Sequence, residues 1–295
     1  MSTVRDALAS LWSAFTRTAV GRLLLTTVRY VFKYRVSNLA AEAGFFTLLS
    51  LPPLVLGLAA VVAWITRSIG AAGQFDLEQN IIDLTQPFLT DEVVNTVVLP
   101  TFRDAIVGPG YGVLSLGFLI SLWSGSRAVN TYLDTVSIMY GYGGHRSALK
   151  QRALSFTLYI AAMLVGAIAV PLVALGPDLI ASWLPLPLEF LVALYWPVVT
   201  VLSVVMLAVL YHVATPLRRS WWRDLPGAFL ALAIWLLASL LMRLILSYSI
   251  GGTSIYGPLA APIVVMLWLY IIALAVLVGA AFNVAVSVEW PRKPE

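Results

Sequence analysis

The sequence predicts an all-α integral membrane protein with six transmembrane helices, and three observations carry that prediction. Of the 295 residues, 60% are hydrophobic and 11% are charged, whereas soluble domains carry about 25% charged residues. Uncharged runs long enough to cross a membrane recur along the chain, and basic residues concentrate in alternate connecting segments. This distribution explains the net charge of +4 by membrane topology, so we expect no binding to nucleic acid.

The six predicted spans follow from the length of the uncharged runs, because the hydrocarbon core needs about 20 apolar residues per helix. The last run, 244–288, is too long for one span and contains the turn-like sequence SYSIGGTSIYGP, which divides it into two helices. The predicted spans cover about 45–66, 105–126, 153–176, 190–213, 225–249 and 259–288.

The basic residues place both termini in the cytoplasm. All but three of the 18 Lys and Arg residues fall in the N-terminal region, the loops after the second and fourth spans, and the tail. The exceptions are Arg67 and Arg103, on the opposite side, and Arg243, inside the fifth span. This asymmetry is the positive-inside pattern of membrane proteins. The first span begins only at residue 45, so we expect no cleavable signal peptide.

The segments outside the spans show helical periodicity. In residues 1–44, Arg22, Arg29 and Lys33 share one face beside apolar residues, which is typical of a helix lying in the headgroup layer. A purely topogenic basic segment is the alternative. The first outer loop, 67–104, predicts two short amphipathic helices broken at Pro87. The chain therefore divides into an interfacial region (1–44), a six-helix transmembrane domain (45–288) and a cytoplasmic tail (289–295).

The sequence contains no residue pattern typical of a hydrolytic enzyme or of a metal site. The chain has no cysteine and two histidines, and it lacks an HExxH pair, a Gly-x-Ser-x-Gly turn and a Walker lysine. We expect His212 to be a hydrogen-bonding residue near the end of the fourth span. The sequence thus predicts no enzyme, no metal site and no cofactor.

Arg243 is the central candidate for a substrate pathway. An arginine near the centre of a membrane helix costs about 2.5–3.5 kcal/mol and normally faces a partner, the bundle interior or water. A structural ion pair, with Glu42 as partner, or a side chain reaching toward the membrane surface is the alternative. Arginine, amide and tyrosine side chains together suit a carboxylate or phosphate anion. The remaining candidates are Asn38, Glu42, Arg127, Asn130, Asp134, Tyr256 and Asn283.

Arg127, Asn130 and Asp134 belong to a helix predicted over 127–140, after the second span. Their spacing of three and four residues places them on one helical face, and Gly141 is expected to stop the helix. A solvated polar face is the alternative to a functional one.

Several segments resemble the YihY/BrkB family of bacterial inner-membrane proteins. The resemblance extends from about Asn38 to Asn283 and is most specific in the C-terminal half. It implies a six-span helical protein in the bacterial inner membrane, with no agreed activity; members have carried ribonuclease, virulence and transport labels. The resembling segments are FFTLLSLPPL, SLWSGSRAVNTYLDTVSIMYG, VLYHVATPLRRSWWRDLPGAFLALAIWLLASL and IYGPLAAPIVVMLWLYIIALAVLVGAAFN.

The chain departs from the family pattern at two places. Members commonly read Gly-Ala-Glu-Leu-Asn near the end of the last span, where this chain has Ala281 in place of the acidic residue, followed by Phe282 and Asn283. The small residue after Tyr-Gly is here Pro258, which stiffens the helix start. If that acid binds a proton or cation in relatives, this chain binds it at another site or not at all.

We therefore expect a transporter or flippase-like protein that moves an amphiphilic anion, with a lipid as one example, passively or with ion coupling. Its partners are membrane lipids. A secondary transporter of ions or small solutes, coupled through Glu42, is one alternative. A non-transporting scaffold for envelope enzymes is another. The sequence leaves the substrate and the oligomeric state open.

Overall fold

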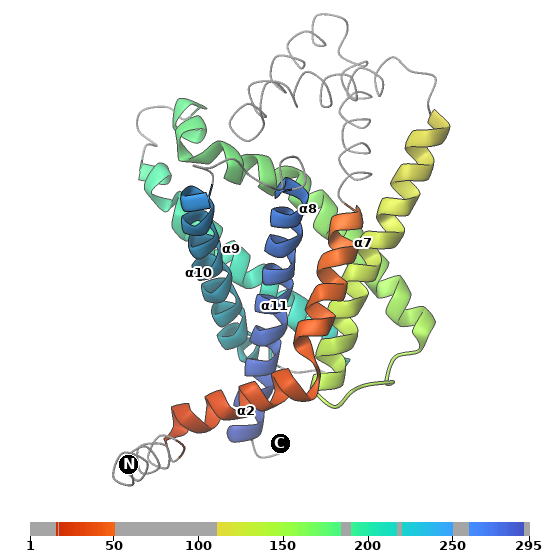
Figure 1. The fold of residues 1–295 in the computed structure, drawn as a ribbon, viewed down its shortest axis with the longest axis vertical. Coiled ribbons are helices and arrows are strands. Elements are labelled where there is room, and N and C mark those ends of the chain that lie inside the picture. Colours follow the sequence, from red (N-terminus) through yellow and green to blue (C-terminus); the bar gives the residue numbers. More distant parts are fainter. Residues whose placement is uncertain are drawn as a thin grey trace, which may run out of the picture. The chain divides into compact units, whose positions relative to one another are not determined.

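The computed structural model describes residues 16, 18–50, 111–183, 190–216, 220–249 and 260–291, and every regular element in these ranges is helical (Figure 1). The expected all-α class is thereby confirmed for the described residues. A helix without a label in Figure 1 covers residues 36–50. The labelled elements are α2 (Ala19–Lys33), α7 (Tyr111–Met139), α8 (Ala148–Trp183), α9 (Phe190–Ala214), η3 (Trp221–Arg223), α10 (Leu225–Ser249) and α11 (Ala260–Glu289).

The chain divides into two compact units. The first unit comprises Met1–Phe45, Arg127–Ser155 and Trp196–Glu295, and the second comprises Phe46–Ser126 and Phe156–Tyr195. The helices α7, α8 and α9 each contribute to both units.

In the second unit, a side-chain hydroxyl group links α7 to the helix over residues 36–50. The Ser124 hydroxyl donates to the Phe46 carbonyl oxygen at 2.9 Å. The Phe46 and Trp123 rings meet edge to face, with centroids 6.3 Å apart. Ser124 is fully buried, so this bond satisfies a hydroxyl that would otherwise destabilise the contact.

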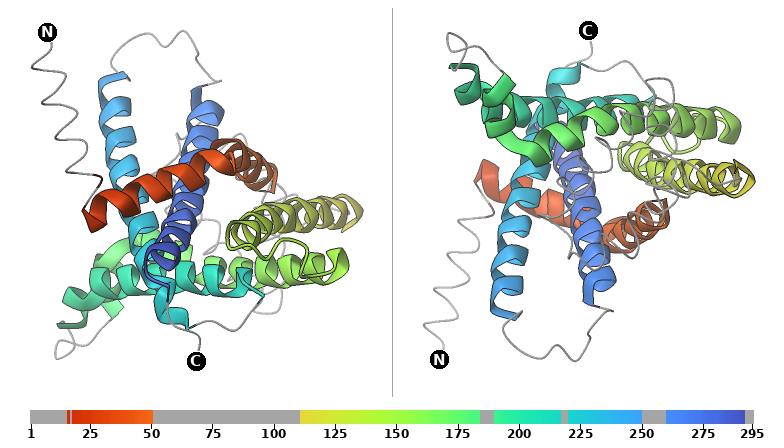
Figure 2. Two further views of the ribbon diagram at one scale, coloured as in Figure 1. Left: turned by 90° about the horizontal axis from the view of Figure 1, so that it is seen from below. Right: turned by 90° about the horizontal axis from the view of Figure 1, so that it is seen from above.

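The first unit begins with α2, which crosses the C-terminal end of α11 (Figures 1 and 2). Thr18 caps α2 by accepting a hydrogen bond from the Gly21 N–H at 3.0 Å. Glu289 then holds the helix in place, because its carboxylate accepts from Arg22 at 3.3 Å and from Thr26 at 2.9 Å. Arg35, with φ of 51°, turns the chain into the helix over residues 36–50.

The helices α10 and α11 pack closely at two glycines of the first unit. A Cβ atom at Gly279 would overlap the Gly227 carbonyl oxygen and lie 2.6 Å from the Tyr211 hydroxyl oxygen. Only glycine permits this approach, as at other small-residue contacts between membrane helices. The buried Tyr211 hydroxyl ties α9 to the same place by donating to the Val276 carbonyl oxygen at 2.7 Å.

The loop between α7 and α8 is fixed at both ends. The helix α7 stops where the sequence predicts, because Gly141 adopts a φ of 82° and the Tyr142 N–H donates to the Ser137 carbonyl oxygen at 2.8 Å. Arg146 then donates to the carbonyl oxygen of Val213 at 2.7 Å, at the C-terminal end of α9.

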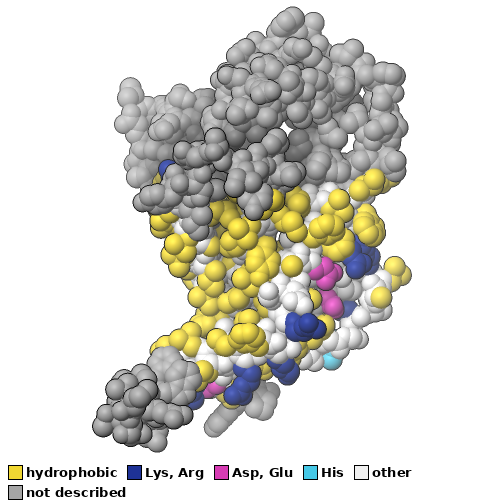
Figure 3. All heavy atoms as spheres, viewed as in Figure 1, with side chains coloured by type: hydrophobic (Ala, Val, Ile, Leu, Met, Phe, Trp, Pro, Cys, Tyr) yellow, Lys and Arg dark blue, Asp and Glu magenta, His cyan; other side chains and the backbone are white. Residues whose placement is uncertain are grey.

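Three described helices are long and apolar enough to cross a membrane: Leu194–Ala214, Trp221–Leu244 and Ile263–Glu289. Figure 3 shows a hydrophobic surface beside the Lys and Arg side chains that lie along α2. The chain thus has the helices of a membrane protein, while the number of six spans and the orientation stay predictions. The predicted amphipathic helices of the first outer loop lie outside the described residues.

Several helix boundaries differ from the sequence-based ones. The helix α8 runs from Ala148 to Trp183 and so extends past both ends of the predicted span, 153–176. Two further differences concern charged residues. The helix predicted over 127–140 is the continuation of the second predicted span, because α7 runs unbroken from Tyr111 to Met139. The helix that leads into the first predicted span begins at residue 36, nine residues before the expected start. In both cases a charged residue that suggested a boundary, Arg127 or Glu42, lies inside a helix.

Candidate functional site

Arg127 and Glu42 form an ion pair between α7 and the helix over residues 36–50. The Arg127 Nη2 atom lies 3.9 Å from Glu42 Oε1, and the Thr131 hydroxyl lies 3.4 Å from the same oxygen. The side chains of Arg127 and Glu42 remain 48% and 41% exposed. A pair this exposed contributes about 0–1 kcal/mol, so a ligand can replace either partner at small cost. Glu42 thus pairs with Arg127 and not with Arg243.

Asp134 and Asn130 extend this polar surface along α7. Asp134 keeps an exposed edge, yet partial desolvation raises its pKa, and the nearby Glu42 carboxylate raises it further. The Asn130 Oδ1 atom accepts a hydrogen bond at 3.1 Å from Ser155 of α8, which fixes the amide. We refer to Glu42, Arg127, Asn130, Thr131 and Asp134 as the Arg127 cluster.

The Arg127 cluster offers an exposed guanidinium for an anion and, at Asp134, a carboxylate whose raised pKa favours binding of a proton. Within the described ranges, no three His, Asp or Glu side chains come together in a way that could hold a metal ion.

An apolar groove lies on an adjoining face of the helix over residues 36–50. It has a volume of about 280 Å³ and separates this helix from α11. Gly44 allows the close approach, since a Cβ atom there would lie 3.2 Å from the Tyr270 backbone. The Tyr270 hydroxyl meets the Ser37 hydroxyl at 3.0 Å. The groove is lined by Ala41, Gly44, Phe45, Ile263, Met266, Leu267 and Tyr270.

The other predicted pathway residues lie apart from the Arg127 cluster. Asn38 is exposed at the start of its helix. Arg243 is exposed on α10, about 27 Å along the helix axis from Leu225, and no described residue forms an ion pair with it. This position near the end of α10 favours the alternative in which the side chain reaches a membrane surface. Tyr256 lies outside the described residues.

Asn283 is buried in a hydrogen-bond network that holds the start of α10. Its Oδ1 atom accepts from the Gly227 N–H at 2.7 Å, and its Nδ2 atom donates to the Asp224 carbonyl oxygen at 2.9 Å. The fully buried Asp224 carboxylate also lies 3.3 Å from His212 Nδ1. His212 is therefore the hydrogen-bonding residue that the sequence predicts, and Asn283 has a structural role whether or not a substrate passes nearby.

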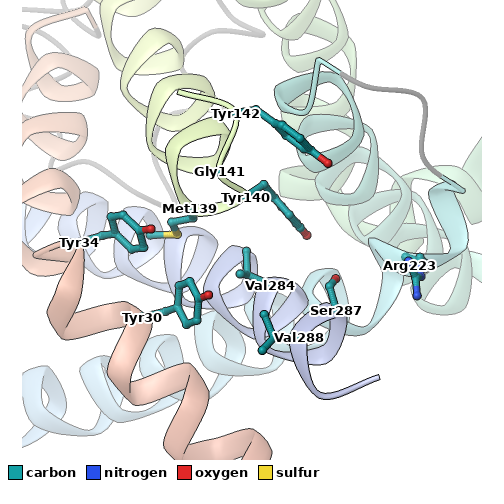
Figure 4. Close-up of a pocket in the computed structure, with 10 residues that line it drawn as sticks. All are labelled: Tyr30, Tyr34, Met139, Tyr140, Gly141, Tyr142, Arg223, Val284, Ser287 and Val288. Atoms are coloured by element: carbon teal, nitrogen blue, oxygen red, sulfur yellow. The ribbon is translucent and has the colours of Figure 1, made fainter. Parts of the chain in front are cut away.

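A second polar site, which was not predicted from the sequence, is a cavity that we call the tyrosine pocket. It has a volume of about 480 Å³ and lies between α2, the end of α7, η3 and α11. Figure 4 shows tyrosines of α2 on one side and tyrosines flanking Gly141 on the other. Two features of the sequence could have indicated this pocket: the spacing Tyr30-x₃-Tyr34 and the Tyr-Gly-Tyr sequence around Gly141. Its polar lining consists of Tyr30, Tyr34, Tyr140, Tyr142, Arg223 and Ser287.

Comparison with known proteins matches nearly the whole chain. A family model described as virulence factor BrkB matches residues 27–295. A putative ribonuclease-like protein, YfkH, of Bacillus subtilis is 25% identical over 250 residues, which cover 83% of this chain and 87% of that protein. A UPF0761 membrane protein of Tolumonas auensis is 25% identical over 271 residues, covering 89% and 84%. No solved structure gives a significant match.

Proposed function

The chain belongs to the virulence factor BrkB family, and from that premise we propose that it carries an amphiphilic anion across the bacterial inner membrane. A phospholipid is one such anion. The protein acts in this proposal without covalent chemistry, and its partners are the membrane lipids.

The main support for this proposal is that one helix has a charged surface and an apolar surface side by side. Glu42 meets Arg127 on one face of the helix over residues 36–50, while Ala41, Gly44 and Phe45 line the groove on an adjoining face. A molecule with an anionic head and a hydrocarbon tail fits such a pair of surfaces. The head takes the place of Glu42 at Arg127, and the tail occupies the groove.

The position of α2 supports the same proposal. Its exposed apolar residues recur every four positions and form one stripe, so the helix can rest on the membrane surface. Basic side chains beside the stripe attract anionic lipids to that surface. The stripe consists of Val20, Leu24, Val28 and Phe32.

Reconstituted protein tests the proposal. Vesicles containing wild-type protein should move a fluorescent anionic phospholipid between leaflets faster than empty vesicles. Arg127→Gln should slow the movement about tenfold, because it removes a charge-assisted contact of about 1.5 kcal/mol. Lys150→Gln removes a positive charge from an exposed position of α8 and should leave the rate near that of wild type. Equal rates for wild type, Arg127→Gln and empty vesicles would refute the proposal.

Arg243→Ala belongs in the same series. A wild-type rate for this variant, together with a slow Arg127→Gln, would assign the anion contact to the Arg127 cluster. A rate for Arg243→Ala as low as that of empty vesicles would indicate that Arg243 belongs to the substrate pathway.

A secondary transporter of ions or small solutes is the second candidate, favoured by the two neighbouring carboxylates Glu42 and Asp134. Coupling to protons through Glu42 predicts that Glu42→Gln abolishes the dependence of flux on a pH gradient. Flux that survives Glu42→Gln at every pH would exclude this coupling. If no variant affects any flux and an envelope enzyme co-purifies, the protein is a scaffold.

A further inference from the structure

We infer that the tyrosine pocket, beside α2 in the first unit, is a binding site for a phosphate-ester anion. Its volume of about 480 Å³ falls within the range of about 300–1,000 Å³ that is usual for sites of small ligands. The pocket is distinct from the Arg127 cluster, since the two share no residue.

The donors in the pocket suit an anion. Arg223 donates one N–H to the Trp290 carbonyl oxygen at 3.3 Å, which leaves further N–H groups of its guanidinium for a ligand. The hydroxyls of Tyr30, Tyr34 and Tyr142 make no hydrogen bond with another described residue. The described lining contains this guanidinium and no carboxylate. Hydroxyl donors around an arginine are the groups that bind phosphate oxygens.

A quaternary ammonium group is the competing ligand, because clustered tyrosine rings can bind such cations. Two observations argue against it. The Lys33 Nζ atom already lies over the Tyr30 and Tyr34 rings, 5.7 Å and 5.0 Å from their centroids. The positive charge of Arg223 also repels a second cation. The charge of the site therefore selects an anion over a choline group.

The walls of the pocket are held in place without a ligand. The Tyr30 and Tyr34 rings stack with their centroids 5.8 Å apart. The left-handed conformation of Gly141 turns the chain so that Tyr140 and Tyr142 both line the cavity (Figure 4). A preformed site of this kind loses little conformational entropy on binding.

Under the proposed function, on which this use of the pocket rests, the pocket receives the anionic head before transport. The same chemistry would bind a water-soluble phosphate ester. Titration calorimetry on the full-length protein in a nonionic detergent separates these sources with four probes: dihexanoyl phosphatidylglycerol, dihexanoyl phosphatidylcholine, glycerol phosphate and inorganic phosphate.

We expect phosphatidylglycerol to bind more tightly than phosphatidylcholine, and Arg223→Gln to weaken its binding about tenfold. Tyr142→Phe, which keeps the ring, should weaken binding about threefold. Lys150→Gln, which removes a positive charge outside the pocket, is the control and should bind as wild type does. Comparable affinity for glycerol phosphate would identify a water-soluble source, whereas binding of phosphatidylglycerol alone would identify a lipid.

Tighter binding of phosphatidylcholine, or equal losses in Arg223→Gln and Lys150→Gln, would overturn the inference. Unchanged thermal melting of Tyr142→Phe excludes misfolding as the cause of its weaker binding. The binding assay uses no vesicles, so binding to the pocket can be detected even if the protein does not move lipid between leaflets. The inference about the pocket and the proposed function can therefore be refuted separately.

Discussion

Replacing Asn283 with alanine should destabilise the protein, because Asn283 links α11 to the first turn of α10. The variant loses the acceptor for the buried Gly227 N–H, while the Asp224 carbonyl oxygen keeps a second donor, the Ala228 N–H at 3.2 Å. A buried donor left without a partner costs about 1–3 kcal/mol. The space left by the amide adds a smaller cost, so we expect a loss of about 2–3 kcal/mol.

Thermal melting of the purified protein, followed by tryptophan fluorescence, measures this loss. The melting temperature of Asn283→Ala should fall by about 4–10 °C. Asn38→Ala removes the same amide from an exposed position and should melt within about 2 °C of wild type. A wild-type melting temperature for Asn283→Ala, together with lost lipid movement, would refute the structural assignment and indicate direct contact with the substrate.

Three further predictions use the same melting assay. Gly279→Ala should destabilise the protein by about 2–4 kcal/mol, because its Cβ would push α10 from α11 and disturb the Tyr211 hydrogen bond. Gly166→Ala, with open space around its Cβ, is the control and should not destabilise the protein. Equal melting temperatures of the two variants would contradict the packing of α10 against α11. Folding raises the pKa of Asp134, so its contribution to stability is fully present below its ordinary pKa of 3.8 and is lost as pH rises through the raised value. Asp134→Asn should therefore gain melting temperature relative to wild type between about pH 4 and pH 7, and a constant difference over that range would disprove the shift. Arg146→Gln should cost about 1–2 kcal/mol, because Arg146 donates to two carbonyl oxygens at the end of α9; unchanged melting would show that other groups satisfy that helix end.

The helical class and several helix ends could be predicted because they depend on local sequence. The stop of α7 is an example: Gly141 adopts a left-handed conformation that other residues rarely adopt, and Gly141 was the expected end. Composition and run length likewise depend on no tertiary contact. These features therefore follow from the sequence without knowledge of the packing.

The pairing of charges could not be predicted in the same way. Glu42 and Arg127 each suggested the edge of a span, since an isolated charge is costly inside a membrane. Both nevertheless lie inside helices, where they form an ion pair at 3.9 Å. That pairing depends on the packing of two helices 85 positions apart in sequence, which no local pattern reports. Asn283 was likewise visible as a polar residue in an apolar helix, while its partner Gly227 was not.

The tyrosine pocket shows a related limit. Tyr30 and Tyr34 are neighbours on α2 by spacing alone, but their position opposite Tyr140 and Tyr142 depends on how α2 crosses α11. That crossing is fixed by Glu289, which contacts Arg22 and Thr26 more than 260 positions away in sequence.

Selectivity for charge tests the central claim most directly. Vesicles that contain the protein and equal amounts of fluorescent phosphatidylglycerol and phosphatidylcholine allow both rates of movement to be measured in the same sample. An anion carrier predicts faster movement of phosphatidylglycerol in wild type, with the ratio of the two rates falling toward one in Arg127→Gln. Equal rates for the two lipids in wild type, unchanged in Arg127→Gln, would contradict the claim.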